Sequence, residues 1–288
     1  MSRLFEALRQ SENESRVAGT IALPESPEEL IQTFCTDPVE LEGRTVDAKP
    51  SSNGHLVSLT HEFGLAAEKF RVLATRLEHL RSLKPLKTLH IASSVGEEGK
   101  TLVAANLGIA LAKSSQRVLL VEGDLRKPQL TQLLGVPAEP GLCDWHREPD
   151  AELSRFVLRL RGLNVWLLTA GNPPRDAREI LHSSRLREAV SQLALSFDWV
   201  IIDSPPLVPV ADAHVWARMA DGTLLVVREG KTPRKVLTQA LESLDNPRLV
   251  GVILNDASDS GGIHYEHYSL DSEPAEAMPV VQAKGSGV

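Results

Sequence analysis

The chain has 288 residues, of which 42% are hydrophobic and 24% are charged, and its formal net charge at pH 7 is -7. This size and apolar content predict one α/β core of ordinary size, with room for irregular terminal segments. The negative charge gives no general attraction to a phosphate backbone, so we expect no nucleic-acid partner.

The first 58 residues carry little of the pattern expected of a folded core. Residues 1–35 are predicted to form an N-terminal helical segment that opens with a short amphipathic helix, or alternatively with a frayed and solvated end. Residues 36–58 are rich in Pro, Gly, Ser, Asn and acidic side chains, which predicts a flexible linker. We therefore expect the folded domain to span residues 59–257.

Within that domain, short apolar runs alternate with helical stretches. Strands are predicted at residues 86–93, 117–123, 163–170, 199–205, 222–229 and 249–256. Helices are predicted at residues 64–83, 100–113, 183–195, 211–219 and 233–244. Continuous apolar runs separated by helices are typical of strands that are covered on both faces. The pattern therefore predicts a three-layer, doubly wound, mostly parallel α/β sheet, followed by a polar, disordered tail over residues 258–288.

A glycine-containing turn, SSVGEEGKT over residues 93–101, joins the first core strand to the next helix. The backbone N–H groups of such a turn and the positive end of the helix favour a phosphate group. We expect Lys100 to reach the β and γ oxygens of a nucleotide and the Thr101 hydroxyl to bind Mg²⁺. The alternative is an ordinary glycine turn with a solvated lysine, because Ser94 stands at the first glycine position of the general motif. The predicted nucleotide-binding residues of this segment are Gly96, Glu98, Gly99, Lys100, Thr101 and Leu102.

Acidic residues follow two of the predicted strands, at the edge where ligands collect in open parallel sheets. VIIDSPP contains Asp203, which we expect to hold the water shell of Mg²⁺ opposite the turn, and VLLVEGDLRKP contains Glu122 and Asp124. A single acid in such a place is often only a solvated helix cap. Three of them beside a phosphate-binding turn favour a site for a metal and a general base.

These motifs resemble those of the bacterial P-loop tyrosine kinases, also called capsular or exopolysaccharide tyrosine autokinases. The resemblance covers residues 58–268 and rests on SSVGEEGKT, VEGDLR, VIIDSPP and the helix AEKFRVLATRL, while MSRLFEALR is similar to the start of an exopolysaccharide-associated subgroup. It implies a P-loop NTPase fold of the ParA/MinD-like type. ParA and MinD ATPases carry a signature lysine at the position of Val95, so its absence favours the kinase branch.

The resemblance implies an ATP-dependent, non-specific protein-tyrosine kinase that phosphorylates itself and regulates exopolysaccharide or capsule synthesis and export. By resemblance, Lys100 and Thr101 bind the phosphates and magnesium, and Asp124 and Asp203 position magnesium through water. Glu122 holds the place of the acid that orients or deprotonates the tyrosine hydroxyl. This role is chemically reasonable, because a phenol with a pKa near 10 is a poor nucleophile at neutral pH.

Further expectations concern the end of the chain. Asn255 matches a position that contacts the base of the nucleotide, or alternatively ends a simple turn after a strand. Tyr265 and Tyr268 are the expected acceptors of the phosphoryl group in trans, because the family carries acceptor tyrosines in its tail. Their alternative interpretation is two solvated aromatic side chains.

The resemblance also implies a partner, a transmembrane polysaccharide copolymerase or chain-length regulator that activates the kinase. The sequence lacks a run of roughly 18 to 20 apolar residues, and its cysteines fit a reducing compartment. We therefore expect a cytoplasmic protein, or one held peripherally at the inner membrane by that partner. Self-association stays open, because the family motif E-x-x-R-x-x-R has Glu68 and Arg71 in place but ends in Ala74.

Departures from the family pattern keep other functions open. Glu122 stands where the family usually has Asp, and Glu97 stands where it usually has glycine in the phosphate turn. A second hypothesis is a nucleotide-gated module that docks to the membrane copolymerase without phosphoryl transfer. A third is a ParA-like positioning ATPase, against which Val95 argues.

Overall fold

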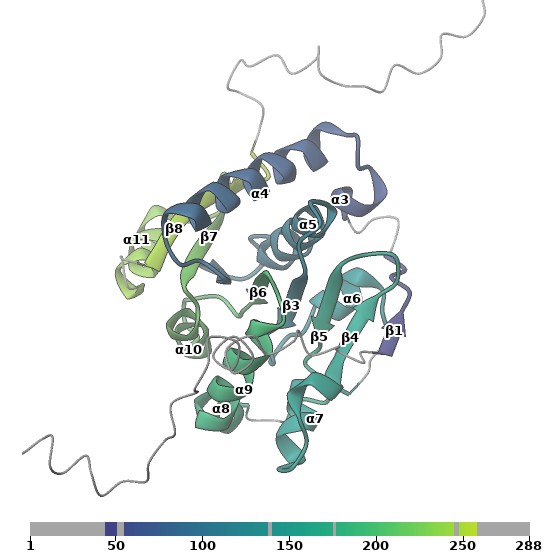
Figure 1. The fold of residues 1–288 in the computed structure, drawn as a ribbon. Helices are drawn as coiled ribbons and strands as arrows, with labels where there is room; N and C mark the ends of the chain where they lie inside the picture. The colour runs from purple at the N-terminus through teal and green to yellow at the C-terminus, as the bar shows by residue number, and fades with distance from the viewer. Residues whose placement is uncertain (1–43, 51–54, 138–139, 175–176, 245–247, 258–288) are drawn as a thin grey trace, which may run out of the picture. The chain divides into compact units, whose positions relative to one another are not determined.

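The computed structural model describes residues 44–50, 55–137, 140–174, 177–244 and 248–257 (Figure 1). All of them belong to one compact unit. The predicted N-terminal helical segment and the predicted tail, with Tyr265 and Tyr268, lie outside the described residues.

The centre of this unit is an eight-stranded sheet with the strand order β1-β4-β5-β3-β6-β2-β7-β8. Neighbouring strands run parallel except for β4 and β5, which are antiparallel. This arrangement confirms the predicted mostly parallel sheet. The strands are β1 Arg44–Val46, β2 Thr88–Ser93, β3 Val118–Glu122, β4 Val157–Leu160, β5 Val165–Leu168, β6 Trp199–Asp203, β7 Gly222–Arg228 and β8 Leu249–Asn255.

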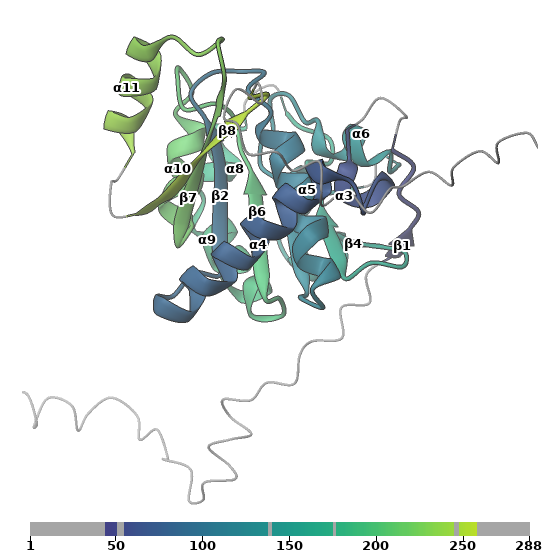
Figure 2. The same ribbon diagram turned by 90° about the horizontal axis from the view of Figure 1, so that it is seen from above.

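Helices cover both faces of the sheet (Figures 1 and 2). On one face α3, α4, α5 and α6 enclose the largest hydrophobic cluster, and on the other face α7 to α11 enclose two more. The helices are α3 Val57–Thr60, α4 Leu65–Leu83, α5 Lys100–Lys113, α6 Leu130–Leu134, α7 Leu142–Arg147, α8 Arg178–His182, α9 Ser184–Leu195, α10 Asp212–Met219 and α11 Arg234–Ser243, with a 3₁₀ turn η1 at Leu153–Phe156. The predicted three layers are therefore present.

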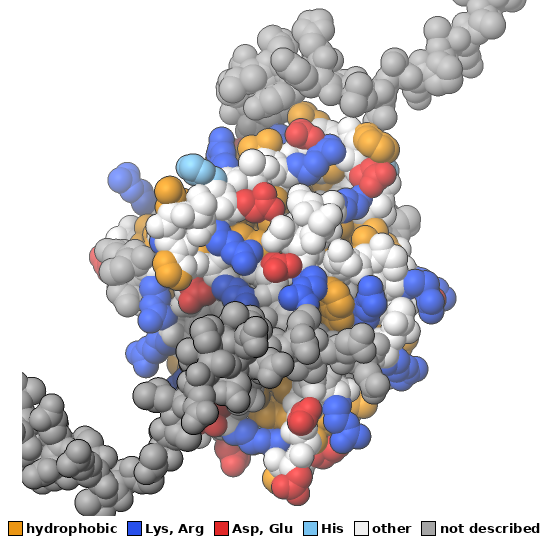
Figure 3. Space-filling view, viewed as in Figure 1, with side chains coloured by type: hydrophobic (Ala, Val, Ile, Leu, Met, Phe, Trp, Pro, Cys, Tyr) orange, Lys and Arg blue, Asp and Glu red, His pale blue; other side chains and the backbone are white. Residues whose placement is uncertain are grey.

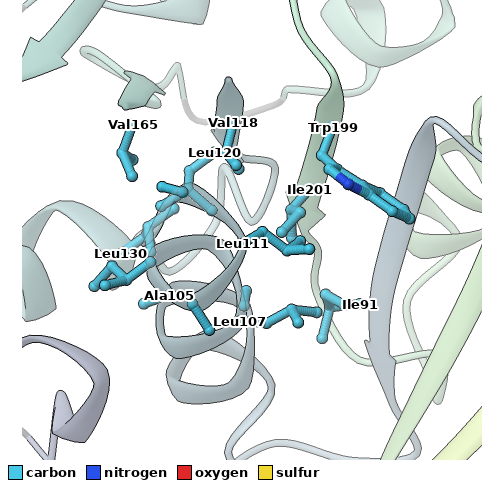
Figure 4. Close-up of a cluster of buried hydrophobic side chains, with 14 of the residues drawn as sticks. Ile91, Ala105, Leu107, Leu111, Val118, Leu120, Leu130, Val165, Trp199 and Ile201 are labelled. Carbon is cyan, nitrogen blue, oxygen red and sulfur yellow. The ribbon is translucent and has the colours of Figure 1, made fainter. Parts of the chain in front are cut away.

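Helix α5, which begins at the end of the glycine-containing turn, is packed tightly into the core. It lies between the sheet and α4, and Leu107 and Leu111 point into the cluster formed with β2, β3 and β6 (Figure 4). Gly108 allows this close packing, because a Cβ atom there would lie 2.6 Å from the Leu120 side chain on β3. Burial on both sides explains why this helix is apolar around most of its circumference.

The segment expected to be a linker, residues 36–58, contributes to the folded unit instead. Strand β1 pairs in parallel with β4, Val46 is buried, and the buried Leu56 directly precedes helix α3. A single apolar residue in a polar stretch gives no periodic signal, and the partner strand is more than a hundred residues away. The folded unit thus includes residues before the predicted start at 59, and the outer domain boundaries stay a prediction.

The surface of the described residues is polar and mixed in charge. Lys and Arg side chains are interspersed with Asp and Glu over the face shown in Figure 3. Large hydrophobic side chains that stay exposed include Phe63, Leu83 and Leu195. In the part of the chain that the structure describes, no helix has both the length and the hydrophobicity needed to cross a bilayer.

Candidate functional site

The glycine-containing turn connects the carboxyl end of β2 to the first residue of α5, as predicted. Gly99 precedes the helix with a φ of 93°, a conformation that glycine adopts without steric cost. Within the described residues, no side chain caps the start of α5. The first N–H groups of this helix are therefore available to a phosphate group.

A pocket of about 350 Å³ opens beside this turn. One wall is the turn itself with the start of α5, and the other is the region of α6. The lining residues are Glu97, Gly99, Lys100, Thr101, Leu102, Gln129, Gln132 and Leu133. Four of the six predicted nucleotide-binding residues of the turn therefore face one cavity.

Glu98 has a different position from the one expected for a nucleotide ligand. One carboxylate oxygen accepts a hydrogen bond from the Val95 backbone N–H at 2.9 Å, and the other is bonded by the Thr232 hydroxyl. The side chain is buried, and it braces the turn from within. Gly96 has open space around the position of a Cβ atom, so no steric need for glycine is evident there.

The predicted acidic residues converge behind the turn. Glu122 and Asp203 are register partners at the ends of β3 and β6, and both are buried. Asp124 follows two residues after β3, and its Oδ2 lies 3.5 Å from Lys100 Nζ. The structure thus brings together the lysine and the three carboxylates that the sequence singled out.

Asp203 carries the most perturbed carboxyl group of this site. Burial raises its pKa to about 7, against the effect of the nearby Lys100 ammonium and a hydrogen bond with Thr101. Its Oδ1 finds no hydrogen-bond partner among the described residues. A buried carboxylate oxygen without a donor is costly, which indicates a site that a cation or a ligand completes.

The oxygen ligands at this site fit magnesium. Mg²⁺ is usually held by one or two carboxylates together with substrate phosphates and water, rather than by a full protein cage. Thr101 lines the pocket, and two carboxylates lie next to its lining residues: Asp124 beside Lys100, and Asp203 bonded to Thr101. Among the described residues, no three or more His, Cys, Asp or Glu side chains form a group that could hold a metal ion by themselves.

Glu122 accepts three hydrogen bonds from two other segments. Its Oε1 accepts the Thr131 backbone N–H at 2.9 Å, and its Oε2 accepts the Thr131 hydroxyl at 2.5 Å and the Ala170 N–H at 3.1 Å. The expectation from the sequence was an acid that meets the tyrosine hydroxyl. The observed hydrogen bonds instead connect β3 to α6 and to the residues after β5.

Residues from β7 and β8 hold the other side of the turn. Asn255 Nδ2 donates to the Glu98 carbonyl at 3.0 Å, and Arg228 Nη1 donates to the Glu97 carbonyl at 3.4 Å. A Cβ atom at Gly99 would lie only 2.1 Å from Asn255 Nδ2. Asn255 therefore contacts the phosphate turn, and its contact with a base stays a prediction.

Sequence analysis missed several residues of this site: Gln129, Thr131, Gln132, Leu133, Arg228 and Thr232. The first four belong to the short α6 region, which has no helical pattern long enough to be recognised. Arg228 and Thr232 act through single hydrogen bonds to the turn, and no sequence motif marks such contacts. The one available signal for α6 was its position directly after VEGDLRKP, at the ligand-binding edge of the sheet.

Comparison with known proteins places this geometry in a family. The CobQ/CobB/MinD/ParA nucleotide binding domain family matches residues 89–282. Tyrosine-protein kinase YwqD of Bacillus subtilis (strain 168) is 30% identical over 216 residues, which is 74% of this chain and 91% of that protein. The succinoglycan biosynthesis transport protein ExoP of Rhizobium meliloti (strain 1021) is 32% identical over 194 residues, but the match spans only 25% of that protein.

Structural similarity points the same way. The kinase domain of the Escherichia coli tyrosine kinase ETK superimposes with a TM-score of 0.65 and 26% identity, and the match covers 73% of this chain and 84% of that one. This structural match shows that the similarity to tyrosine kinases covers most of the described residues and not only the short motifs. The chain belongs to the bacterial tyrosine-protein kinases within the CobQ/CobB/MinD/ParA nucleotide-binding domain family.

Proposed function

We propose that this protein is an ATP-dependent protein-tyrosine kinase that phosphorylates itself and regulates exopolysaccharide or capsule synthesis and export. The observation that carries the proposal is a pocket lined by Lys100, Thr101 and the uncapped start of α5, with Asp124 beside Lys100 and Asp203 bonded to Thr101 behind it. Such a site holds phosphates on one side and oxygen ligands for a cation on the other. The kinase relatives YwqD and ETK support phosphoryl transfer as the reaction.

Each residue of the site has a separate role in phosphoryl transfer. The N–H groups at the start of α5 bind the phosphate oxygens, and Lys100 adds a positive charge where negative charge develops on the transferring group. Thr101, Asp124 and Asp203 hold Mg²⁺, directly or through water. The ion supplies further charge neutralisation when it is bound with ATP. Burial of Lys100 and both aspartates strengthens each of these electrostatic interactions.

The acceptors and the partner extend the proposal beyond the described residues. We assign Tyr265 and Tyr268 as the acceptors, on a tail spanning residues 258–288 that a neighbouring subunit phosphorylates. The activator is a transmembrane polysaccharide copolymerase, which holds the protein at the inner face of the membrane. The match to one quarter of ExoP, a succinoglycan transport protein, supports a link to polysaccharide export.

Mass spectrometry of the intact protein and its peptides tests the reaction. The purified chain is incubated with Mg-ATP, alone and with the cytoplasmic segment of a polysaccharide copolymerase. Phosphate is expected on Tyr265 or Tyr268 in the parent and in Lys113→Met, a control at the exposed end of the same helix α5. Lys100→Met should carry none. Absence of phosphotyrosine from the parent under both conditions contradicts the kinase proposal.

A second candidate is the nucleotide-gated module, in which ATP binding alone changes docking to the copolymerase. Two observations favour it: Glu97 adds a negative charge to the pocket lining, and the carboxylate of Glu122 is occupied by three donors. Saturable ATP binding without phosphotyrosine in the preceding experiment would support this candidate.

A further inference from the structure

The short helix α6 forms a wall of the pocket but has little stability of its own. It has five residues, and within the described part of the chain no side chain caps its start at Gln129. Isolated helices of this length are not stable in water, so tertiary contacts must fix its position. Gln129, Gln132 and Leu133 line the pocket, so any shift of α6 changes the shape of the cavity.

Two kinds of contact hold α6 in place. Leu130 and Leu134 are completely buried in the core, which fixes the helix against the sheet. The polar contact comes from Glu122, which accepts both the backbone N–H and the hydroxyl of Thr131. The buried leucines set which face of α6 meets the core. The two directed hydrogen bonds to one carboxylate add a polar constraint on the rotation of the helix about its axis.

The remaining bond of Glu122 fixes the carboxylate itself. Ala170, two residues after β5, donates its N–H to the oxygen that also accepts the Thr131 hydroxyl. The carboxylate is therefore held between β3, the end of β5 and α6. An aspartate at this position would be shorter by one C–C bond, about 1.5 Å, so it could not reach both partners without movement of the backbone.

We propose that Glu122 is a positioning residue, which orients α6 through Thr131 and thereby sets the wall of the nucleotide pocket. The tyrosine hydroxyl does not meet this carboxylate, because the Glu122 side chain is only 1% exposed and both of its oxygens already accept hydrogen bonds from within the protein. The inference rests on the proposed function only in that the pocket binds a nucleotide. It requires no phosphoryl transfer, so the two proposals can fail separately.

Affinity for a fluorescent ATP analogue carrying an N-methylanthraniloyl group, measured with Mg²⁺, tests the link to α6. Thr131→Val keeps the shape of the side chain but removes its hydroxyl, and loss of one charge-assisted hydrogen bond should weaken binding by about three- to tenfold. Thr131→Ser retains the hydroxyl and should bind within about twofold of the parent. Thr238→Val makes the same replacement at an exposed position of α11 and should change nothing.

The comparison with Glu122→Asp separates positioning from proton transfer. A positioning role predicts weaker nucleotide affinity and a raised KM for ATP in Glu122→Asp, with a smaller change in kcat. It also predicts that adding Thr131→Val to Glu122→Asp causes little further loss, because both changes remove the same contact. Thermal unfolding checks that each variant is folded.

Several outcomes would overturn the inference. The inference fails if Thr131→Val binds the analogue as tightly as the parent does. It also fails if Glu122→Asp loses phosphotransfer while its nucleotide affinity is unchanged. If Thr131→Val fails to fold, the test is the comparison of Thr131→Ser with Glu122→Asp. Equal nucleotide affinity in these two variants would also overturn the inference. If the parent shows no phosphotyrosine but the affinity pattern holds, the proposed kinase function fails and the positioning role stands.

Discussion

The phosphate turn lies between two flanks that differ in how they are held. Towards β3 and β6, its neighbours are Glu122, Asp124 and Asp203, all at most 5% exposed. Towards β7 and β8, an ion pair between Arg228 and Asp256 supports the turn, and the Asp256 side chain is 60% exposed. We call these the buried flank and the exposed flank.

This difference has an energetic consequence. A polar contact in the buried flank has no water to replace it, so its loss leaves an unsatisfied group and costs more than the bond itself contributes. Contacts of the exposed flank exchange with water at little cost. We therefore expect the buried flank to define a fixed geometry and the exposed flank to let the turn adjust when phosphates bind.

The largest effect is expected for Asp203→Asn in the absence of nucleotide and metal. The folded protein raises the pKa of this carboxyl from 3.8 to about 7, so it retains a proton that the unfolded chain has lost. Stability of the parent therefore falls as pH rises from about 4 to 7. Asparagine cannot ionise, so at pH 8 the variant should be more stable by at most roughly 4 kcal/mol.

Urea unfolding in the presence of a chelator measures this effect. Parent and variant should have similar stability near pH 4 and diverge above it, whereas Asp150→Asn, at an exposed position, should follow the parent throughout. The variant should also lose the stabilisation that Mg-ATP gives to the parent. A variant less stable than the parent at pH 8 would show that the carboxylate is already compensated by a partner.

Gly99→Ala, at the junction of the two flanks, is the next largest change. Alanine is disfavoured at a φ of 93°, and its Cβ would collide with Asn255 Nδ2. Together, strain and collision should lower stability by about 2 kcal/mol and weaken nucleotide binding at least tenfold. Nucleotide titration and urea unfolding measure the two losses.

The double variant with Asn255→Gly separates the two causes of this loss. It removes the collision but not the strain, so it should recover part of the nucleotide affinity. No recovery at all would mean that the backbone conformation alone accounts for the loss and that Asn255 does not restrict the turn.

The buried flank was also the more predictable one from the sequence. Continuous apolar runs predict strands β3 and β6. Glu122 and Asp203 are the last residues of these strands, and Asp124 lies two residues after β3. Lys100 and Thr101 could be placed because a local motif fixes a turn between a strand and a helix. In each case the signal lies within about ten consecutive residues.

What could not be predicted depends on partners that are distant in the sequence. Val46 belongs to a strand only because β1 pairs with β4, and Thr232 bonds Glu98 although the two lie 134 residues apart in the sequence. Glu98 was expected at the phosphates because it lies within the phosphate-binding motif. A motif gives the order of residues along the chain but does not show in which direction each side chain points. The engagement of Glu122 by Thr131 went unnoticed because α6 is too short to give a periodic pattern.

A smaller effect is expected for Thr232→Val, on the β7 side of the turn but in contact with a buried carboxylate. It removes the hydroxyl that bonds Glu98, a buried carboxylate that retains its second bond to the Val95 N–H. Loss of one hydrogen bond to a buried carboxylate should cost about 1.5 kcal/mol of stability and weaken nucleotide binding roughly two- to fivefold. Thr75→Val, an exposed threonine on α4 that bonds only a carbonyl of its own helix, is the matched control. Equal behaviour of the two variants would remove Thr232 from the support of the turn.

Arg228→Gln should have the smallest effect, and it tests the exposed flank most directly. Arg228 bonds the Glu97 carbonyl at 3.4 Å, and its ion pair with Asp256 is open to solvent. Exposed pairs contribute roughly 0.2 to 1 kcal/mol, and salt screens them. We expect nucleotide affinity within about twofold of the parent, and a difference that shrinks further when affinity is measured in 0.5 M salt instead of 0.05 M. A loss as large as that of Gly99→Ala would mean that the exposed flank holds the turn as firmly as the buried one, because the energy lost would exceed what a solvated ion pair supplies.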